Sequence, residues 1–281
     1  MLNAEQALIL KPLLEELIER SAPDERRSHD PVDLVWNYQD PCDQEVVALI
    51  TSCLAYGRVS LLKRAVAQVL APMGHHPAEF LRTFKPADLP ELYDGFVYRM
   101  SRAADIADLL AGIAHVILKH GSLEQAYRHH GGLSHTEAAS ELVRAVRAAR
   151  LRSDMARGLA YLLPDPRDGS SCKRLHLFFR WVTRGPDGID LGIWTAVSPA
   201  DLIMPLDTHT SRLCRYIGLT DRSTVDAKMA LEVTDSLRLL DPDDPLRYDF
   251  ALCHLGISGR CIHRRSAEHC PGCPIEGVCT L

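Results

Sequence analysis

Start and stop signals for one helix both lie in the segment Pro205-Leu206-Asp207-Thr208-His209-Thr210-Ser211-Arg212-Leu213-Cys214-Arg215-Tyr216-Ile217-Gly218. Asp207 can cap its start, because a side-chain carboxylate accepts the free backbone N–H groups of a first helical turn. Gly218 suits the left-handed conformation in which many helices end. The run between them is amphipathic at helical spacing. The segment therefore predicts a short helix that begins after Asp207.

The same helical spacing extends along most of the chain on both sides of this segment. Apolar residues recur three or four positions apart in the N-terminal twenty residues and in eight further runs: Val46–Cys53, Leu61–Leu70, Ile106–Lys119, Glu137–Arg150, Leu175–Val182, Thr210–Tyr216, Lys228–Leu239 and Arg247–Leu255. Pro- and Gly-containing turns separate these runs, and the alternation typical of strands is nearly absent. We therefore expect an all-α protein.

Composition limits the classes of function. The chain has 281 residues, 46% of them hydrophobic and 25% charged, as in an ordinary soluble globular protein. Aromatic residues make up 6%, too few for an extended base-stacking surface. The formal net charge of −5 excludes attraction of the whole protein to nucleic acid or anionic membrane, but leaves local basic patches open.

The first twenty residues carry charges where a signal peptide would need an apolar core. The longest uncharged apolar run, Val46–Tyr56, is too short to cross a bilayer. We therefore expect a cytoplasmic protein that contacts no membrane and whose thiols stay reduced. Clustered cysteines in that setting indicate metal or redox chemistry.

Charge is unevenly distributed along the chain. Glu141–Arg184 contains ten basic and four acidic residues, whereas Asp221–Asp249 contains eight acidic and four basic residues. The basic block could neutralise phosphates. Each block could equally form one solvated face of the protein.

Four of the nine cysteines, Cys261, Cys270, Cys273 and Cys279, lie in the last 21 residues with the spacing C-x8-C-x2-C-x5-C. Four thiolates in a short loop can enclose a [4Fe–4S] cluster or a structural zinc ion. Zinc sites more often use two C-x2-C pairs, which favours the cluster over zinc. Free thiols on a mobile tail are the third interpretation. The scattered cysteines are better explained as small buried side chains.

Two of these segments together carry a family resemblance. The Leu206-Asp207-Thr208-His209 stretch and the C-x2-C-x5-C tail resemble the helix-hairpin-helix DNA glycosylases of the endonuclease III superfamily. The resemblance implies that Asp207 is catalytic and that the four C-terminal cysteines hold a [4Fe–4S] cluster. The first gap of eight residues, between Cys261 and Cys270, is longer than the family's gap.

A hairpin with a catalytic lysine is the third part of the resemblance. Leu163-Pro164-Asp165-Pro166-Arg167-Asp168-Gly169-Ser170-Ser171-Cys172-Lys173-Arg174 has the family's Leu-Pro start and a Lys at the head of the next helix, but not its compact L-P-G-V-G pattern. The 34-residue gap from Lys173 to Asp207 is similar to that of the archaeal GO glycosylases, which remove 8-oxoguanine. The chain also resembles an uncharacterised bacterial family of predicted iron–sulfur proteins.

The implied chemistry uses Lys173 as an amine nucleophile that forms a Schiff base with a sugar from which the base is lost. Arg174 beside it would favour the neutral amine. Asp207 would orient the amine and stabilise positive charge on the sugar. Without the resemblance, Lys173 is equally a lysine that contacts phosphate, and Asp207 is fully explained as a helix cap.

Contacts with DNA are also implied by the resemblance. Backbone N–H groups at Gly169, Ser170 and Ser171 would bind a phosphate at a helix N-terminus. Further predicted DNA contacts are Arg174, Tyr56 as a wedge in the duplex, Arg58 in the same loop, and Arg260 beside the cysteines.

The sequence thus predicts an all-α, two-lobed helix-hairpin-helix glycosylase fold with a C-terminal iron–sulfur loop at 261–279. One lobe would span 40–184, and the other 1–39 plus 185–281. The predicted function is a monomeric DNA glycosylase and AP lyase that removes a damaged base from double-stranded DNA, with 8-oxoguanine as the first guess. Two alternatives stay open: a non-catalytic iron–sulfur protein that binds nucleic acid, and a cluster-carrying redox or interaction protein that does not.

Overall fold

The computed structural model describes residues 2–21, 27–153, 157–257 and 259–281. Helices dominate these ranges, so the prediction of an all-α protein is confirmed. The strands within them are β1 (Val97–Tyr98) and β2 (Ser101–Arg102), which form a small antiparallel hairpin. None of the helices in the described ranges combines the length and apolar character that crossing a bilayer requires.

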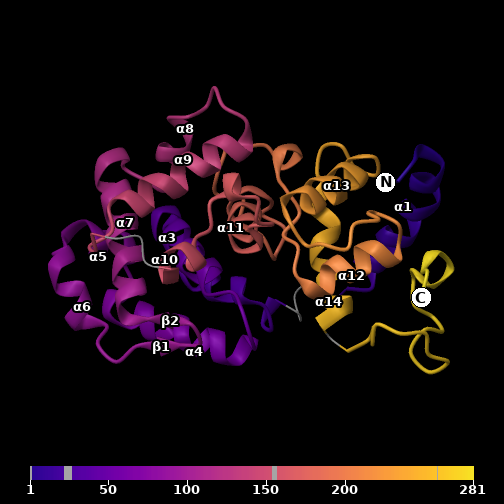
Figure 1. The fold of residues 1–281 in the computed structure, drawn as a ribbon, viewed down its shortest axis with the longest axis horizontal. Helices are drawn as coiled ribbons and strands as arrows, with labels where there is room; N and C mark the ends of the chain where they lie inside the picture. Colours follow the sequence, from indigo (N-terminus) through magenta and orange to yellow (C-terminus); the bar gives the residue numbers. More distant parts are fainter. Residues whose placement is uncertain (1, 22–26, 154–156, 258) are drawn as a thin grey trace.

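The helices gather into two groups on either side of the central α11 (Lys173–Thr183), as Figure 1 shows. One group is formed by α3 (Pro41–Cys53), α4 (Val59–Leu70), α5 (Pro77–Thr83), α6 (Leu89–Leu92), α7 (Ala103–His120), α8 (Leu123–Arg128), α9 (His135–Ala148) and α10 (Arg157–Leu162). The other is formed by α1 (Ala4–Glu19), α12 (Thr208–Tyr216), α13 (Ala227–Arg238) and α14 (Asp249–Ile257). The first helix of the chain therefore lies with the last three (Figure 1).

The helix ends follow the capping signals of the sequence. The Asp207 carboxylate accepts hydrogen bonds from the backbone N–H groups of His209 and Thr210, both at 2.9 Å, at the start of α12. Gly218 follows the end of α12 in a left-handed conformation, with φ of 76°. The predicted helix 207–218 is confirmed. The other predicted helical runs also coincide with helices of the structure.

The side chains that α11 buries are largely aromatic. Phe178, Phe179 and Trp181 are fully buried, and this helix packs against α3. The segment after α11 returns over its C-terminal end, because Leu191 and Trp194 donate backbone hydrogen bonds to the carbonyls of Trp181 and Val182, at 2.7 and 2.8 Å. Burying such large rings supplies much of the hydrophobic stabilisation of this region. It also holds the N-terminal end of α11 in one place.

A buried ion network joins α11 to the second group of helices. Arg180 donates two hydrogen bonds of 3.1 Å to Asp190 and a third to Asp249, at the start of α14. Arg184 binds Asp244 through two hydrogen bonds of 2.8 Å and also contacts Asp190. Because buried charges are tolerated only when they are paired, this network fixes the position of α11 relative to α14.

His176, one turn before Arg180, makes the stability of α11 depend on pH. Burial, together with the nearby His135, lowers the pKa of His176 to about 3. The unfolded chain therefore binds a proton below about pH 6.5 that the folded protein does not bind, and stability is lost as the pH falls. Between pH 7 and 5, this histidine alone should cost about 2 kcal/mol of unfolding free energy.

Urea unfolding of the His176→Leu variant at pH 5, 6 and 7 checks this expectation. The difference in unfolding free energy between wild type and variant should shift by about 2 kcal/mol in the variant's favour from pH 7 to 5. His75→Ala, which removes a histidine on the surface, is measured beside it as the control variant. A constant difference between wild type and His176→Leu would show that His176 becomes protonated within the folded protein.

Candidate functional site

A cleft of about 850 Å³ lies between the two groups of helices. It is lined from the first group by residues around Tyr56 and Tyr161, from α11 by Lys173, and from the second group by residues around Asp207 and Asp249. A cavity of this size can hold a ligand as large as a nucleotide. Its walls come from segments that are far apart in the sequence.

Lys173 and Asp207 meet inside this cleft. The Lys173 Nζ lies 3.3 Å from the Asp207 Oδ2, and both side chains are partly exposed, at 29% and 21%. Lys173 is the first residue of α11, and Asp207 is the N-cap of α12. The structure therefore brings together the two residues that the sequence assigned to catalysis.

Asp207 is held as a carboxylate. Burial alone would raise its pKa, but the charge of Lys173 and the backbone N–H groups of Thr210 and His209 outweigh burial and lower the pKa. The capping bonds use Oδ1, and Oδ2 faces the lysine. One oxygen thus anchors the side chain to α12 while the other is directed at the amine.

Two cysteines line the cleft near Lys173, and both are inert as nucleophiles. Burial raises the pKa of the Cys172 thiol to about 11 and also raises that of Cys253. Because the thiolate is the reactive form, both residues are neutral thiols at physiological pH. Cys172 has a left-handed backbone, with φ of 43°, immediately before Lys173. This uncommon conformation of a non-glycine residue sets the direction in which α11 starts.

The segment predicted to bind phosphate reaches the cleft in part. Ser170 and Ser171 line it, and the Ser170 hydroxyl accepts a hydrogen bond of 3.3 Å from the backbone N–H of Cys172. Gly169 has a φ of 79° and accepts a 3.0 Å hydrogen bond from the backbone N–H of Ala227, which holds the segment against the start of α13. Gly169 is not among the residues that line the cleft.

Arg174 and Tyr56 line the cleft but are held within the protein. Arg174 donates from Nη1 to the carbonyl of Cys53, at 3.2 Å, and from Nη2 to the carbonyl of Tyr161. The Tyr56 hydroxyl lies 2.8 Å from the Ser101 hydroxyl and donates to the carbonyl of Tyr98. Insertion of Tyr56 into a duplex would require its bonds to break. Arg174 does not use all five of its N–H donors in these two bonds, so it could contact a phosphate only from this fixed position.

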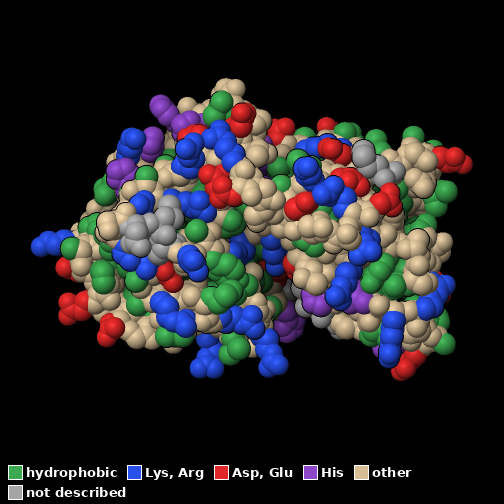
Figure 2. Space-filling view, viewed as in Figure 1, with side chains coloured by type: hydrophobic (Ala, Val, Ile, Leu, Met, Phe, Trp, Pro, Cys, Tyr) green, Lys and Arg blue, Asp and Glu red, His purple; other side chains and the backbone are tan. Residues whose placement is uncertain are grey.

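The rim of the cleft beside Tyr56 is basic, and only one of its arginines, Arg58, was predicted from the sequence. Arg58 is exposed at the start of α4, and the β1–β2 hairpin adds the exposed Arg99 and Arg102. Gly57 has a φ of 87°, and a Cβ there would lie 2.9 Å from the Arg99 Nε, so this glycine lets the hairpin approach the loop closely. Figure 2 shows Lys and Arg side chains gathered beside the hollow between the two halves of the molecule. A hairpin with two-residue strands has no hydrophobic period by which the sequence could reveal it.

The basic block of the sequence, in contrast, is largely neutralised inside the protein. Arg152 pairs with Asp105 and Asp108, and Arg167 pairs with Glu141. Arg180 and Arg184 belong to the buried network described above. The predicted role of this block as a phosphate-binding surface was therefore wrong for these residues, because Arg167 is paired within the block and the others are paired with carboxylates outside it.

The four C-terminal cysteines form a second, separate constellation. Cys261, Cys270, Cys273 and Cys279 all line one small cavity of about 30 Å³, next to Arg260. Burial and the neighbouring thiols raise the pKa of Cys273. In the parts of the chain that the structure describes, no group of three or more His, Cys, Asp or Glu side chains is arranged to hold a metal ion. The thiols thus share a cavity without being drawn into a ligand geometry.

The cysteine loop is attached to the helix that carries Asp207. The Nε2 of His263 lies 3.2 Å from the Nδ1 of His209, and the backbone N–H of Thr280 donates to the carbonyl of Tyr216, at 2.9 Å. Arg260, predicted to contact DNA, lines the cysteine cavity and is not among the residues that line the cleft.

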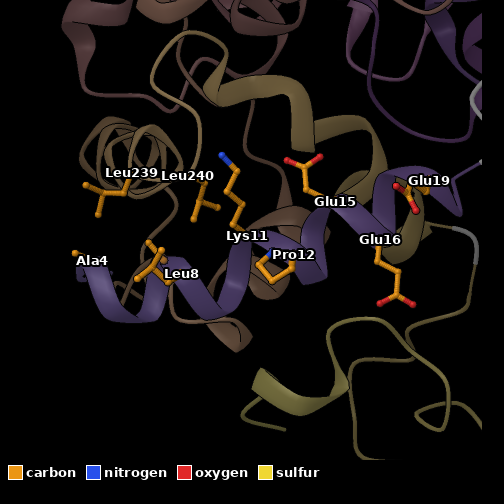
Figure 3. Close-up of a pocket in the computed structure, with 10 residues that line it drawn as sticks. Ala4, Leu8, Lys11, Pro12, Glu15, Glu16, Glu19, Leu239 and Leu240 are labelled. Atoms are coloured by element: carbon orange, nitrogen blue, oxygen red, sulfur yellow. The ribbon is translucent and has the colours of Figure 1, made fainter.

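A third cavity, of about 740 Å³, lies along α1. Figure 3 shows side chains of α1 on one side of it and Leu239 and Leu240 on the other. Leu8 is 78% exposed there, and charged side chains of α1, among them Lys11 and Glu16, also line the groove. The Glu15 carboxylate is bound by Arg247 and the Tyr248 hydroxyl, and the groove contains no pair like that of Lys173 and Asp207 among its lining residues.

Comparison with known proteins gives one family match. Residues 30–258 match the family model described as protein of unknown function DUF2400. No curated protein and no solved structure matches the chain.

This match corrects the sequence-based assignment. The predicted membership in the helix-hairpin-helix DNA glycosylase superfamily was wrong, because the family that covers most of the chain is a distinct one, and no glycosylase family model matches. The Asp-Thr-His stretch and the C-x2-C-x5-C tail are short motifs, and they do not establish membership of a family.

Proposed function

The chain belongs to the DUF2400 family of proteins of unknown function, and we propose that it is a lysine-dependent DNA glycosylase and AP lyase. The observation that carries this proposal is the 3.3 Å contact between the Lys173 Nζ and the Asp207 Oδ2 in a cleft of nucleotide size. Schiff-base chemistry needs a lysine amine within reach of the substrate, and the fixed carboxylate of Asp207 can position that amine.

In the proposed reaction the neutral amine of Lys173 attacks the C1′ carbon of a nucleotide that has left the base stack. Before the attack, the ammonium proton that Lys173 carries beside Asp207 passes to water. The C1′–N bond then breaks, the base departs with the bonding electrons, and it takes up the proton that the attacking nitrogen releases. The sugar ring then opens to a protonated Schiff base on Lys173. Loss of a C2′ proton expels the 3′ phosphate, and hydrolysis by one water returns the free lysine.

Asp207 has two tasks in this scheme. Its ionised carboxylate directs the amine and stabilises the positive charge that develops on the sugar as the base leaves. It suits the second task because the backbone N–H groups of His209 and Thr210 hold it in place and, together with the charge of Lys173, lower its pKa against the effect of burial. Cys172 and Cys253 are neutral thiols and do not compete with Lys173 as the nucleophile.

Double-stranded DNA with a damaged base is the proposed substrate. The exposed Arg58, Arg99 and Arg102 on the rim would contact its phosphates. We propose that the duplex lies across the boundary between a lobe at 40–184 and a second lobe made of 1–39 and 185–281. Because 8-oxoguanine is a bulky oxidised purine that a cleft of about 850 Å³ can accept, it is the first lesion to test.

We also propose that the loop at 261–279 binds a [4Fe–4S] cluster through Cys261, Cys270, Cys273 and Cys279. In support, all four thiols line a single cavity. A bound cluster would supply the crosslink that holds this loop, which is too short to build a core of its own. Its attachment to α12 would help to keep Asp207 in position.

Borohydride trapping tests the catalytic proposal. Borohydride should reduce the Schiff base between wild-type protein and a duplex that contains a lesion or an abasic site, and so leave a covalent complex. Lys173→Gln should abolish the complex, because the amine is gone. Asp207→Asn should slow base removal by about 10²–10⁴-fold.

Lys63 provides a matched control, because its Nζ pairs with the Asp33 carboxylate at 2.7 Å with similar exposure but outside the cleft. Lys63→Gln should therefore trap as well as wild type. The catalytic proposal fails if wild-type protein binds DNA but traps on no lesion and no abasic site, which would leave a non-catalytic nucleic-acid-binding protein. Absence of DNA binding at low salt would leave only a redox or interaction protein.

The dependence of DNA affinity on salt tests the rim. In the Arg58→Ala/Arg99→Ala double variant, the slope of log affinity against log salt should become less steep by about 1.8, because two phosphate contacts are lost. Arg144→Ala/Arg167→Ala is the control, since both of these arginines pair with Glu141. A larger loss of slope in the control variant would place the DNA on the α9 side and contradict the proposed orientation.

Metal analysis tests the loop. Anaerobically purified protein should be brown and contain about four iron and four sulfide per chain. Cys273→Ser should lose most of the iron, whereas Cys42→Ser, which lies outside the cavity, should keep it. One zinc per chain without iron would replace the cluster by a structural zinc site.

A further inference from the structure

A compact aromatic cluster forms one wall of the cleft. The ring of Tyr56 lies 4.9 Å from that of Tyr98 and 5.4 Å from that of Tyr161, measured between ring centres. The Cζ of Arg174 lies over the Tyr161 ring, 4.3 Å from its centre, and 5.3 Å from the centre of Tyr56. Few aromatic residues occur in this chain, so their concentration beside Lys173 calls for an explanation.

The members of this cluster differ in accessibility. Tyr98 is buried, at 6% exposed, and Tyr56 is half-buried with its hydroxyl held by Ser101. Tyr161 is 36% exposed and lines the cleft. Its ring meets Tyr56 edge to face, at 84°, so Tyr56 supports it from the side.

Arg174 makes the Tyr161 ring rigid. Its Nη1 and Nη2 groups donate hydrogen bonds to the carbonyls of Cys53 and Tyr161. These bonds hold the flat guanidinium cation against the ring of Tyr161. The Nη2 bond also fixes the backbone that carries the ring. A tyrosine held in this way loses little conformational entropy when a flat ligand binds.

We propose that Tyr161 is the stacking surface of the cleft, on which an unpaired nucleobase of a DNA strand lies next to the reacting nucleotide. Every base has a flat π-face, and aromatic rings and Arg planes are the surfaces on which proteins stack unpaired bases. The basic rim at Arg58 and Arg99 places a phosphate backbone on the same side of the cleft as Tyr161. This inference rests on the proposed function. It assigns to Tyr161 the recognition of a strand with unstacked bases.

A fluorescence binding experiment with the full chain tests the stacking role of Tyr161. The probes are single-stranded oligonucleotides and duplexes with an abasic site, both carrying 2-aminopurine next to the target position. Stacking quenches the fluorescence of 2-aminopurine. Wild type and Tyr161→Phe should quench it equally, because the phenyl ring keeps the stacking face. Tyr161→Ala should lose the quenching and bind about tenfold more weakly. Circular dichroism and thermal unfolding confirm that each variant is folded.

Borohydride trapping on the same abasic duplex separates this inference from the proposed function. If the protein does not trap but Tyr161→Ala still removes the quenching, the lyase proposal fails and the stacking role stands. If Tyr161→Ala traps and quenches like wild type, the stacking role is overturned and the lyase proposal stands. The inference would also be overturned if the free 2-aminopurine nucleoside were quenched as strongly as the oligonucleotides and this quenching depended on Tyr161. The ligand would then be a small molecule instead of a strand.

Discussion

The buried network around Arg180 is the constraint on which the arrangement of the cleft depends. Arg180 is 2% exposed and is bound by Asp190 and Asp249, while Arg184 bridges Asp190 and Asp244. Loss of one partner from such a network leaves a buried charge uncompensated and typically costs about 3–5 kcal/mol. Since Asp249 begins α14 and Arg180 lies in α11, the network sets the spacing of the two halves of the molecule.

The position of the Lys173–Asp207 pair follows from that spacing. Lys173 begins α11, whose aromatic core is fixed against α3, and Asp207 caps α12, which packs on α14. The two side chains therefore meet because two helix starts are brought together by packing and by the network behind them. This arrangement is pre-organised, and a pre-organised charge is the one that stabilises charge in a reaction most effectively.

Local signals were predicted correctly from the sequence, whereas most long-range partners of its charged residues were not. The meeting of Lys173 and Asp207 is the exception, because the family resemblance implied it. The helix 207–218 and its Asp207 cap were predicted because a cap depends on residues within one turn of one another. The basic block 141–184 was misjudged because Arg152 pairs with Asp105 and Asp108, and Arg180 with Asp190 and Asp249, all of them outside the block. Arg99 and Arg102 were missed because the hairpin that presents them is too short to show a period. The family resemblance failed because it rested on short motifs, while the match to DUF2400 extends over residues 30–258.

By itself, then, the sequence determined that the chain is helical, where the helix after Asp207 starts, that Asp207 is a capping carboxylate, and that four cysteines cluster in the last 21 residues. These properties depend on neighbours within a few residues. The tertiary structure decided how these residues are placed. It brings Lys173 to Asp207 and Tyr161 to the wall of the cleft. It also buries Arg180 in an ion network and leaves Arg58 exposed on the rim. The physical reason is that the effect of a charge or a ring depends on its partners and its access to water, and packing brings those partners from distant parts of the chain.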